Sequence, residues 1–316
     1  MRRTELIELH DHPSFPAFLR DLVTDALQSL WQFGNSYSPI LPRLYRSLAA
    51  TSSTSVLDLC AGGGGPWLRL ARQLEHDYCF PVYVRLTDKY PNREAFEHAR
   101  LHSRAPVGSP PQIGLQSQID FVPDPVDATR VPATLGGFRT IFSSFHHFRP
   151  EIARQVLSDA VAANRGIAIF ELAKRDPITI LILFLTPLFV LLLTPGIRPF
   201  RWSRLLWTYL VPIVPFVIWF DGLISCMRAY APQELQEMVR ELEQKMLPEA
   251  AQAPHQPRYR WQVGEEVTGI LPVTFLRACL KTKQAVAAAD VRRRYGSWFP
   301  LRYGAIHSLW RAAATS

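Results

Sequence analysis

The chain has 316 residues, of which 48% are apolar and 20% charged, a composition that fits a folded protein and excludes extensive disorder. Lysine and arginine outnumber aspartate and glutamate by 35 to 27, and the formal charge of +8 favours anionic partners, either a phospholipid surface or a nucleic acid. The cysteines are scattered without a CxxC pair, which argues against a disulfide framework or a zinc site and favours a reducing compartment; no metal site is predicted. They are Cys60, Cys79, Cys226 and Cys279.

The amino-terminal region predicts helices. Charged residues follow Met1-Arg2-Arg3 where a secretory signal would need an apolar run, so no such signal is predicted. Apolar side chains then recur at helical spacing from Phe18 to Trp31, and a second short helix is expected at 43–50 after two prolines. We therefore expect residues 1–50 to form a helical cap in front of the first strand.

Strand and helix patterns alternate after this cap. Strands are expected at 56–60, 82–87, 119–122, 140–145 and 166–172, and helices at 67–74, 93–102 and 151–163. Strands separated by helices imply a mostly parallel sheet covered on both faces. After a helix at 232–245, two closing strands at 259–267 and 273–280 complete a doubly wound α/β sheet of seven strands.

Two apolar segments interrupt the alternation. Residues 178–195 and 205–220 carry no formal charge, and the loop between them contains Arg198, Arg201 and Arg204. Each segment is shorter than the ~20 residues that a membrane-spanning helix needs. Both ends of the pair attach to one soluble domain, so we expect a shallow, monotopic hairpin whose arginines contact phosphate headgroups. The alternative is a buried helical cap or a dimer interface.

The most informative segment is Val56-Leu-Asp-Leu-Cys-Ala-Gly-Gly-Gly-Gly-Pro-Trp67. An apolar strand leads into four glycines and the start of a helix, where backbone amides can approach a ligand closely. The dinucleotide pattern GxGxxG fits poorly, because its third glycine would fall at Trp67. Asp58 instead precedes the glycines inside the strand.

This arrangement resembles motif I of class I S-adenosylmethionine-dependent methyltransferases, with Cys60 where many members have the first glycine. The resemblance covers about residues 50–175 and the closing strands. It implies S-adenosylmethionine as cofactor, an acid on the ribose hydroxyls at Asp88 and an acid near the adenine amino group at Asp127. The full set of cofactor-binding residues expected from it is Asp58, Cys60, Ala61, Gly62, Gly64, Asp88, Lys89, Asp127, Ala128 and Ser144.

Candidates for the chemistry follow the fourth and fifth strands. Ser143-Ser-Phe-His-His-Phe148 occupies the position of the family's active-site loop, and either His146 or His147 could deprotonate an acceptor at neutral pH. The alternative is that a histidine packs under the loop or caps the next helix. Glu171 either takes part in catalysis, lining the acceptor pocket, or has a structural role.

Four polar residues follow the apolar segments: Asp221, Ser225, Arg228 and Tyr230. They either close over the acceptor or belong to an ordinary helix that begins at Asp221 and has Arg228 on its solvent face. The expected divisions are a cap at 1–50, a cofactor-binding core at 51–177, the hairpin at 178–220, the rest of the core at 221–285 and a basic aromatic tail at 286–316. The tail could add a second contact with a membrane surface.

Three functions are consistent with these features. The first is a methyltransferase acting on an O or N atom of a lipophilic small molecule, associated with the cytoplasmic side of a membrane. The second is a methyltransferase of nucleic acid or protein; nucleic acid is disfavoured because the basic residues cluster with apolar ones and no Asn-Pro-Pro-Tyr-like tetrapeptide follows the fourth strand. The third is a non-catalytic membrane module that kept the fold.

Overall fold

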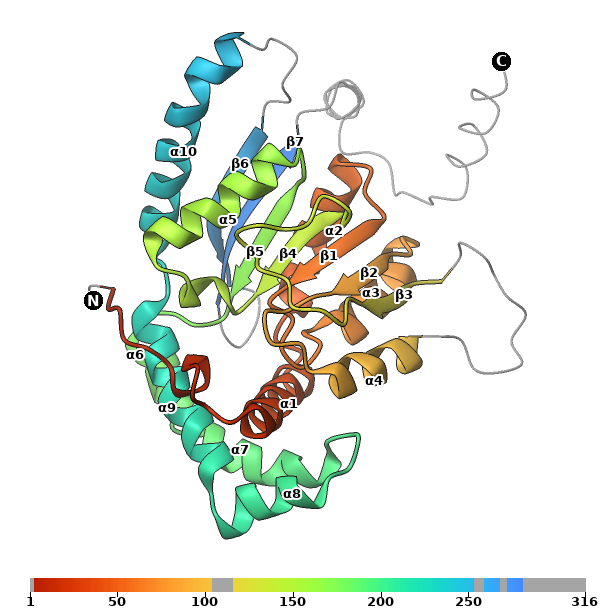
Figure 1. Ribbon diagram of the computed structural model, residues 1–316, viewed down its shortest axis with the longest axis vertical. Helices are drawn as coiled ribbons and strands as arrows, with labels where there is room; N and C mark the ends of the chain where they lie inside the picture. Colours follow the sequence, from red (N-terminus) through yellow and green to blue (C-terminus); the bar gives the residue numbers. More distant parts are fainter. Residues whose placement is uncertain (1–2, 104–115, 253–258, 268–271, 281–316) are drawn as a thin grey trace. The chain divides into compact units, whose positions relative to one another are not determined.

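The computed structural model describes residues 3–103, 116–252, 259–267 and 272–280 (Figure 1). The described residues belong to one compact unit. The basic aromatic tail at 286–316 lies outside them, so the prediction about it stays open.

A seven-stranded sheet forms the centre of the molecule, in the order β3-β2-β1-β4-β5-β7-β6. The first five strands are parallel, and β7 runs antiparallel to both of its neighbours. This confirms the predicted doubly wound, mostly parallel sheet. The strands are β1 (Ser55–Leu59), β2 (Tyr83–Leu86), β3 (Gln118–Phe121), β4 (Phe138–Phe142), β5 (Ile167–Glu171), β6 (Tyr259–Glu266) and β7 (Val273–Leu280).

Helices cover both faces of the sheet (Figure 1). One face packs against α2 (Leu41–Ala50), α3 (Trp67–Tyr78) and α4 (Arg93–Ser103). The other packs against α5 (Pro150–Ala162) and α10 (Pro232–Gln252). Every residue of β4 and β5 is buried, which explains why these central strands read as nearly continuous apolar runs.

A second group of helices packs around α1 (Ala17–Phe33) and α9 (Ile213–Arg228). It includes α6 (Pro177–Leu183), α7 (Thr186–Leu193) and α8 (Trp202–Leu205), and its own small core contains Leu22, Val190 and Val217. The first apolar segment is therefore two short helices, broken where Pro187 stands at the start of α7. By length and hydropathy, 177–196 could cross a membrane, and only 17% of that window is buried.

The second apolar segment is also broken and differs from the prediction at both ends. Residues 202–210 and α9 meet at an angle of 70°. Helix α9 runs on to Arg228, so the expected boundary at 220 falls inside a continuous helix, and Asp221 lies in its middle rather than at its start. A buried carboxylate inside a long apolar helix requires polar partners from elsewhere in the fold.

Two arginines between the apolar segments form ion pairs with other parts of the fold. Arg204 is 1% exposed and forms an ion pair with Asp25 of α1, with Nη2 and Oδ2 2.6 Å apart. Arg201 pairs with Glu94 of α4. The expectation that all three arginines contact lipid headgroups is therefore wrong for Arg204, which is buried against a carboxylate far away in the sequence. For Arg198 and Arg201 it stays a prediction.

Candidate active site

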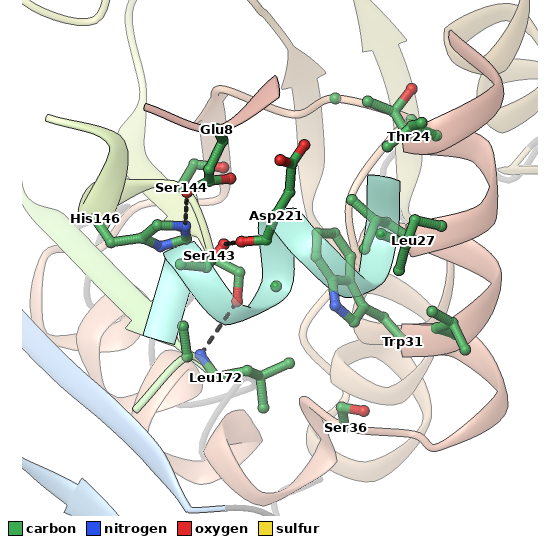
Figure 2. A pocket seen from close by; sticks show the side chains of 18 of the residues that line it. Glu8, Thr24, Leu27, Trp31, Ser36, Ser143, Ser144, His146, Leu172 and Asp221 are labelled. Atoms are coloured by element: carbon green, nitrogen blue, oxygen red, sulfur yellow. Dashed lines mark hydrogen bonds and ion pairs between the residues drawn. The ribbon is translucent and has the colours of Figure 1, made fainter. Parts of the chain in front are cut away.

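A cavity of about 910 Å³ lies beyond the carboxyl ends of β1, β2 and β4, where doubly wound sheets bind their ligands. The turn after β1, the end of β2 and the loop after β4 form one wall, and α1, α6, α7, α9 and a short amino-terminal segment are among the other contributors. Figure 2 shows Leu27 and Trp31 of α1 on one side and Ser144 and His146 on the other. The cavity therefore joins the predicted cofactor region to the predicted catalytic loop.

The four glycines between β1 and α3 form a tight turn against α1. Gly64 has φ of +104°, a conformation that strongly favours glycine. A Cβ atom on Gly63 would lie 2.7 Å from the carbonyl oxygen of Thr24, so the backbones of the turn and α1 are in direct contact. Gly62 and Gly63 line the cavity, and so do Cys60 and Ala61.

Asp58 lies beneath the turn and is not among the described residues that line the cavity. Its carboxylate accepts a hydrogen bond from the Thr140 hydroxyl at 2.6 Å, and the other oxygen would be 3.1 Å from a Cβ on Gly65. Complete burial raises the pKa of Asp58 to about 7, although the bond from Thr140 opposes this rise. The geometry assigns Asp58 to supporting the turn.

Asp88 is at the end of β2, on the cavity wall. One carboxylate oxygen accepts from the Gly62 amide and the other from the Tyr90 amide, each at 2.8 Å. Burial raises the pKa of Asp88, and these two amides partly offset the rise. A carboxylate has about four acceptor positions, so two remain for a pair of hydroxyl groups. The residue fits the sugar-binding role that the resemblance implies.

The remaining predicted cofactor residues divide into two groups. Lys89 and Ser144 line the cavity, and the Ser144 hydroxyl donates to the carbonyl oxygens of Phe142 and Cys60. Asp127 and Ala128 are outside the described cavity wall: the Asp127 carboxylate accepts from Thr129, and Ala128 is buried in the core. Their contact with an adenine stays a prediction.

The three predicted catalytic residues come together at the carboxyl ends of β4 and β5. His146 is 3% exposed, with its Nδ1 2.6 Å from Glu171 and its Nε2 3.4 Å from Glu8. Glu171 also accepts the Phe145 amide at 2.6 Å, which fixes the loop after β4 to the end of β5. His147 places its Nδ1 2.6 Å from Asp11. Both imidazoles face the cavity, and both are held by carboxylates.

Burial and opposite charges shift the titration of this group. Burial alone would lower the pKa of His146, but the carboxylates of Glu171 and Glu8 raise it to about 10. Burial alone would raise the pKa of Glu8, but the imidazoles of His147 and His146 lower it to about 2. Carboxylates and imidazoles therefore compensate one another within a volume from which water is largely excluded.

Sequence reasoning missed the amino-terminal contribution. A short 3₁₀ turn, Leu9–Asp11, follows Glu8; Glu8, His10 and Asp11 line the cavity, and Glu8 is 1% exposed. The signal in the sequence is the dense charged and histidine-containing stretch at 5–12, which by itself argues only against a secretory signal. No local pattern reveals that this stretch reaches residues about 140 positions away, such as His147.

The polar residues of α9 explain how this turn is held. Asp221 accepts the backbone amides of Leu9 and His10 and the His10 imidazole, at 2.7, 3.1 and 2.7 Å. Arg228 is buried near Glu8 and Asp11, at 3.6 and 3.2 Å, so its expected place on a solvent face is wrong. Asp221 and Ser225 line the cavity. The Tyr230 hydroxyl donates to the Phe148 carbonyl at 2.7 Å.

The far wall of the cavity is apolar. Ile182 and Leu183 of α6, Phe189 of α7 and Ile218 of α9 face it. The same helices expose large apolar side chains on the outside of the protein, including Leu181 at 68% and Leu192 at 66%. A thin layer of apolar helices thus separates the cavity from the surroundings.

The sheet order, the reversed β7, the glycine turn after β1 and the acid after β2 define the class of this protein. It has the fold of the class I S-adenosylmethionine-dependent methyltransferases.

Three solved structures are similar in fold. Human N-acetylserotonin methyltransferase is 14% identical with a TM-score of 0.44, over 84% of this chain and 57% of that one. Magnesium protoporphyrin IX methyltransferase from Synechocystis PCC 6803 is 11% identical with a TM-score of 0.41, over 88% and 100%. An O-methyltransferase family protein from Burkholderia thailandensis is 12% identical with a TM-score of 0.42, over 87% and 62%. The matches with the first and third therefore span less than two thirds of those proteins. No protein-family model and no curated protein matches the chain.

Proposed function

We propose that this protein transfers a methyl group from S-adenosylmethionine to an O or N atom of a lipophilic small molecule at a membrane surface. The observation that carries the proposal is the single cavity that connects the glycine turn and Asp88 to the two imidazoles and to an apolar wall. The cofactor would supply an activated methyl group on its sulfonium. The protein supplies alignment, because methyl transfer is a displacement in which donor and acceptor must lie in line.

The residues of the cavity divide naturally between donor and acceptor. The turn at 60–63 and Asp88 would hold the cofactor, with the Asp88 carboxylate on the ribose hydroxyls. His146 and His147 lie on the same cavity wall, where both can bind the polar end of the acceptor. His147 can help remove the acceptor's proton, whereas the carboxylates around His146 keep that imidazole protonated at neutral pH. The apolar side chains of α6, α7 and α9 would surround the rest of the acceptor.

Calorimetric titration with S-adenosylhomocysteine tests the cofactor part of the proposal. Replacing Asp88 by Ala removes hydrogen bonds to a charged acceptor, which are worth about 1.5–3 kcal/mol, so affinity should fall about 10- to 100-fold. Asp124→Ala, in an exposed loop, is the matched control and should bind as the wild type does. No affinity in the wild type, or equal affinity in both variants, would contradict the proposal.

Incorporation of labelled methyl groups tests the activity itself. Wild-type protein incubated with methyl-labelled S-adenosylmethionine and a total lipid extract should yield labelled products that partition into organic solvent. Label that appears only in nucleic acid or protein supplied in parallel would instead support the alternative acceptors. Cofactor binding without transfer to any of the three would support a non-catalytic module.

Membrane association is testable on the outer face of the apolar helices. Leu181→Glu combined with Leu192→Glu places charges on exposed positions and should weaken sedimentation with vesicles of phosphatidylglycerol and phosphatidylcholine about tenfold or more. The control is Leu101→Glu, because Leu101 is 55% exposed on α4. Equal binding by the wild type and the double variant would show that these helices do not contact the bilayer.

A further inference from the structure

The group of side chains around Glu8 has an unusual charge balance. Four carboxylates meet there, those of Glu8, Asp11, Glu171 and Asp221, and each is in contact with an imidazole. Among the described residues, Arg228 is the guanidinium that approaches them, 3.6 Å from Glu8 and 3.2 Å from Asp11. One permanent positive charge cannot balance four carboxylates in a largely buried volume, so the remaining positive charge must come from protons on the imidazoles or from a bound cation.

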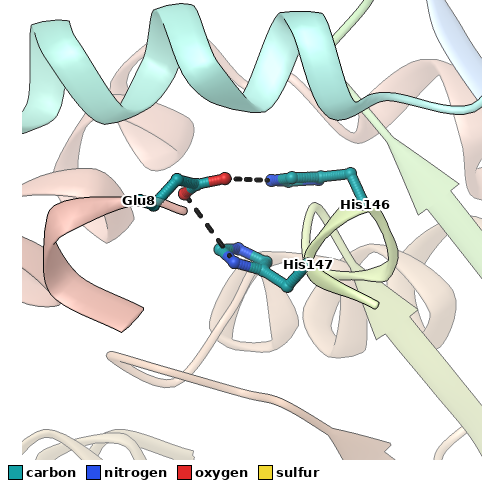
Figure 3. A group of neighbouring side chains, drawn as sticks. All are labelled: Glu8, His146 and His147. Carbon is teal, nitrogen blue, oxygen red and sulfur yellow. Dashed lines mark ion pairs between the residues drawn. The ribbon is translucent and has the colours of Figure 1, made fainter. Parts of the chain in front are cut away.

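Among the residues that the structure describes, two buried polar atoms at the centre of this group have no hydrogen-bond partner. They are Glu8 Oε1 and His146 Nε2, on side chains that are 1% and 3% exposed. The two atoms face each other at 3.4 Å, and Glu8 Oε2 lies 3.7 Å from Nδ1 of His147 (Figure 3). Figure 3 shows the carboxylate of Glu8 and both imidazoles pointing toward one another.

These separations are long for hydrogen bonds and suitable for a bridging ion. An N–H···O bond would bring nitrogen and oxygen to about 2.7–3.2 Å. Two ligand atoms that each lie about 2.1 Å from one ion, at a tetrahedral angle, are about 3.4 Å apart. One ligand atom from each of Glu8, His146 and His147 can be chosen so that all lie within 4.8 Å of one another.

The surroundings of the imidazoles match those of metal ligands. Nδ1 of His146 is held by Glu171 at 2.6 Å while Nε2 faces Glu8, and a carboxylate that orients the second nitrogen of a ligating histidine is a recurring feature of metal sites. Asp11 lies 2.6 Å from Nδ1 of His147, the nitrogen that also faces Glu8, so an ion bound there would replace this hydrogen bond and leave the Asp11 carboxylate as an additional oxygen ligand.

We propose that Glu8, His146 and His147 bind one divalent transition-metal ion at the wall of the cavity. Two imidazoles with one carboxylate suit zinc, iron or manganese better than calcium or magnesium, which prefer oxygen ligands alone. The ion would face the cavity that we assign to the methyl acceptor. This rests on the proposed function and deepens it, because a bound ion lowers the pKa of an acceptor hydroxyl so that its proton can pass to solvent water; the imidazoles would then act as ligands instead of bases.

Manganese binding tests this inference without cofactor or acceptor, so its failure is distinguishable from failure of the methyltransferase proposal. Untagged protein, treated with a chelator and then freed of it, is titrated with Mn²⁺ while the electron paramagnetic resonance of the free ion is recorded. The wild type should bind one equivalent, and added Zn²⁺ should displace it. Glu8→Gln should weaken binding about tenfold or more. Glu5→Gln is the matched control, because this carboxylate is exposed and lies three residues away in the same segment; its affinity should not change.

If Glu8→Gln does not fold, as judged by circular dichroism, His147→Asn replaces it and should show the same loss. The inference is wrong if the wild-type protein leaves the Mn²⁺ spectrum unchanged, or if the ligand variant binds as tightly as Glu5→Gln. In that event protons on the imidazoles supply the balancing charge.

Discussion

The buried ion pair between Arg204 and Asp25 predicts a large and specific loss of stability. Their side chains are 1% and 4% exposed, and the two charged atoms are 2.6 Å apart. Arg204 also donates to the carbonyl oxygens of Ile197 and Pro199, so it joins the loop between the apolar segments to α1. Replacing Asp25 by Asn keeps the shape of the side chain but leaves the guanidinium buried without an opposite charge.

We expect Asp25→Asn to lower the free energy of unfolding by about 3–5 kcal/mol, the usual result of removing one partner of a buried pair. For a chain of this size that corresponds to a decrease in Tm of about 5–8 °C. The pair between Glu94 and Arg201 provides the control in the same loop, because the Glu94 side chain is 66% exposed. Glu94→Gln should cost less than about 1 kcal/mol.

Urea denaturation followed by circular dichroism measures both variants. A double variant, Asp25→Asn with Arg204→Met, should recover part of the loss, because the buried charge is removed together with its partner. Equal destabilisation by Asp25→Asn and Glu94→Gln would refute the reasoning, because burial would then not determine how much an ion pair contributes to the free energy of unfolding.

Three further predictions concern the turn and the catalytic loop. The pKa of Asp58 is raised from 3.8 to about 7, so the folded protein loses stability as the pH rises from about 4 to 7 and this carboxyl ionises in its buried position. The loss is at most about 4 kcal/mol. Asp58→Asn should remove this pH dependence in thermal melts recorded from pH 4 to 8, whereas an unchanged dependence would contradict the assignment. Gly63→Ala should cost about 1–3 kcal/mol because its Cβ would lie 2.7 Å from a backbone oxygen, whereas Gly196→Ala meets nothing within 4 Å and should be nearly neutral in the same urea denaturation. Glu171→Gln should reduce methyl transfer about 100-fold or more while S-adenosylhomocysteine affinity stays within about twofold, because it releases His146; a loss of affinity equal to the loss of rate would contradict this.

The sequence by itself determined the sheet and its ligand-binding edge. Alternating apolar runs and helical patterns predicted all seven strands, because burial on both faces leaves a continuous apolar signature in a parallel sheet. The glycine turn and Asp88 were also predictable, since both carry local signals: a turn that needs positive φ and an acid directly after a strand.

Only the tertiary structure decided what surrounds the two histidines. Glu8 and Asp11 reach His146 and His147 because Asp221, in the middle of α9, anchors the amino-terminal turn, and no spacing in the sequence relates these three segments. The same holds for Arg204, whose partner on α1 lies 179 positions away. Ion pairs between distant segments leave no periodic pattern, because their energy depends on burial and distance in the folded chain rather than on local conformation.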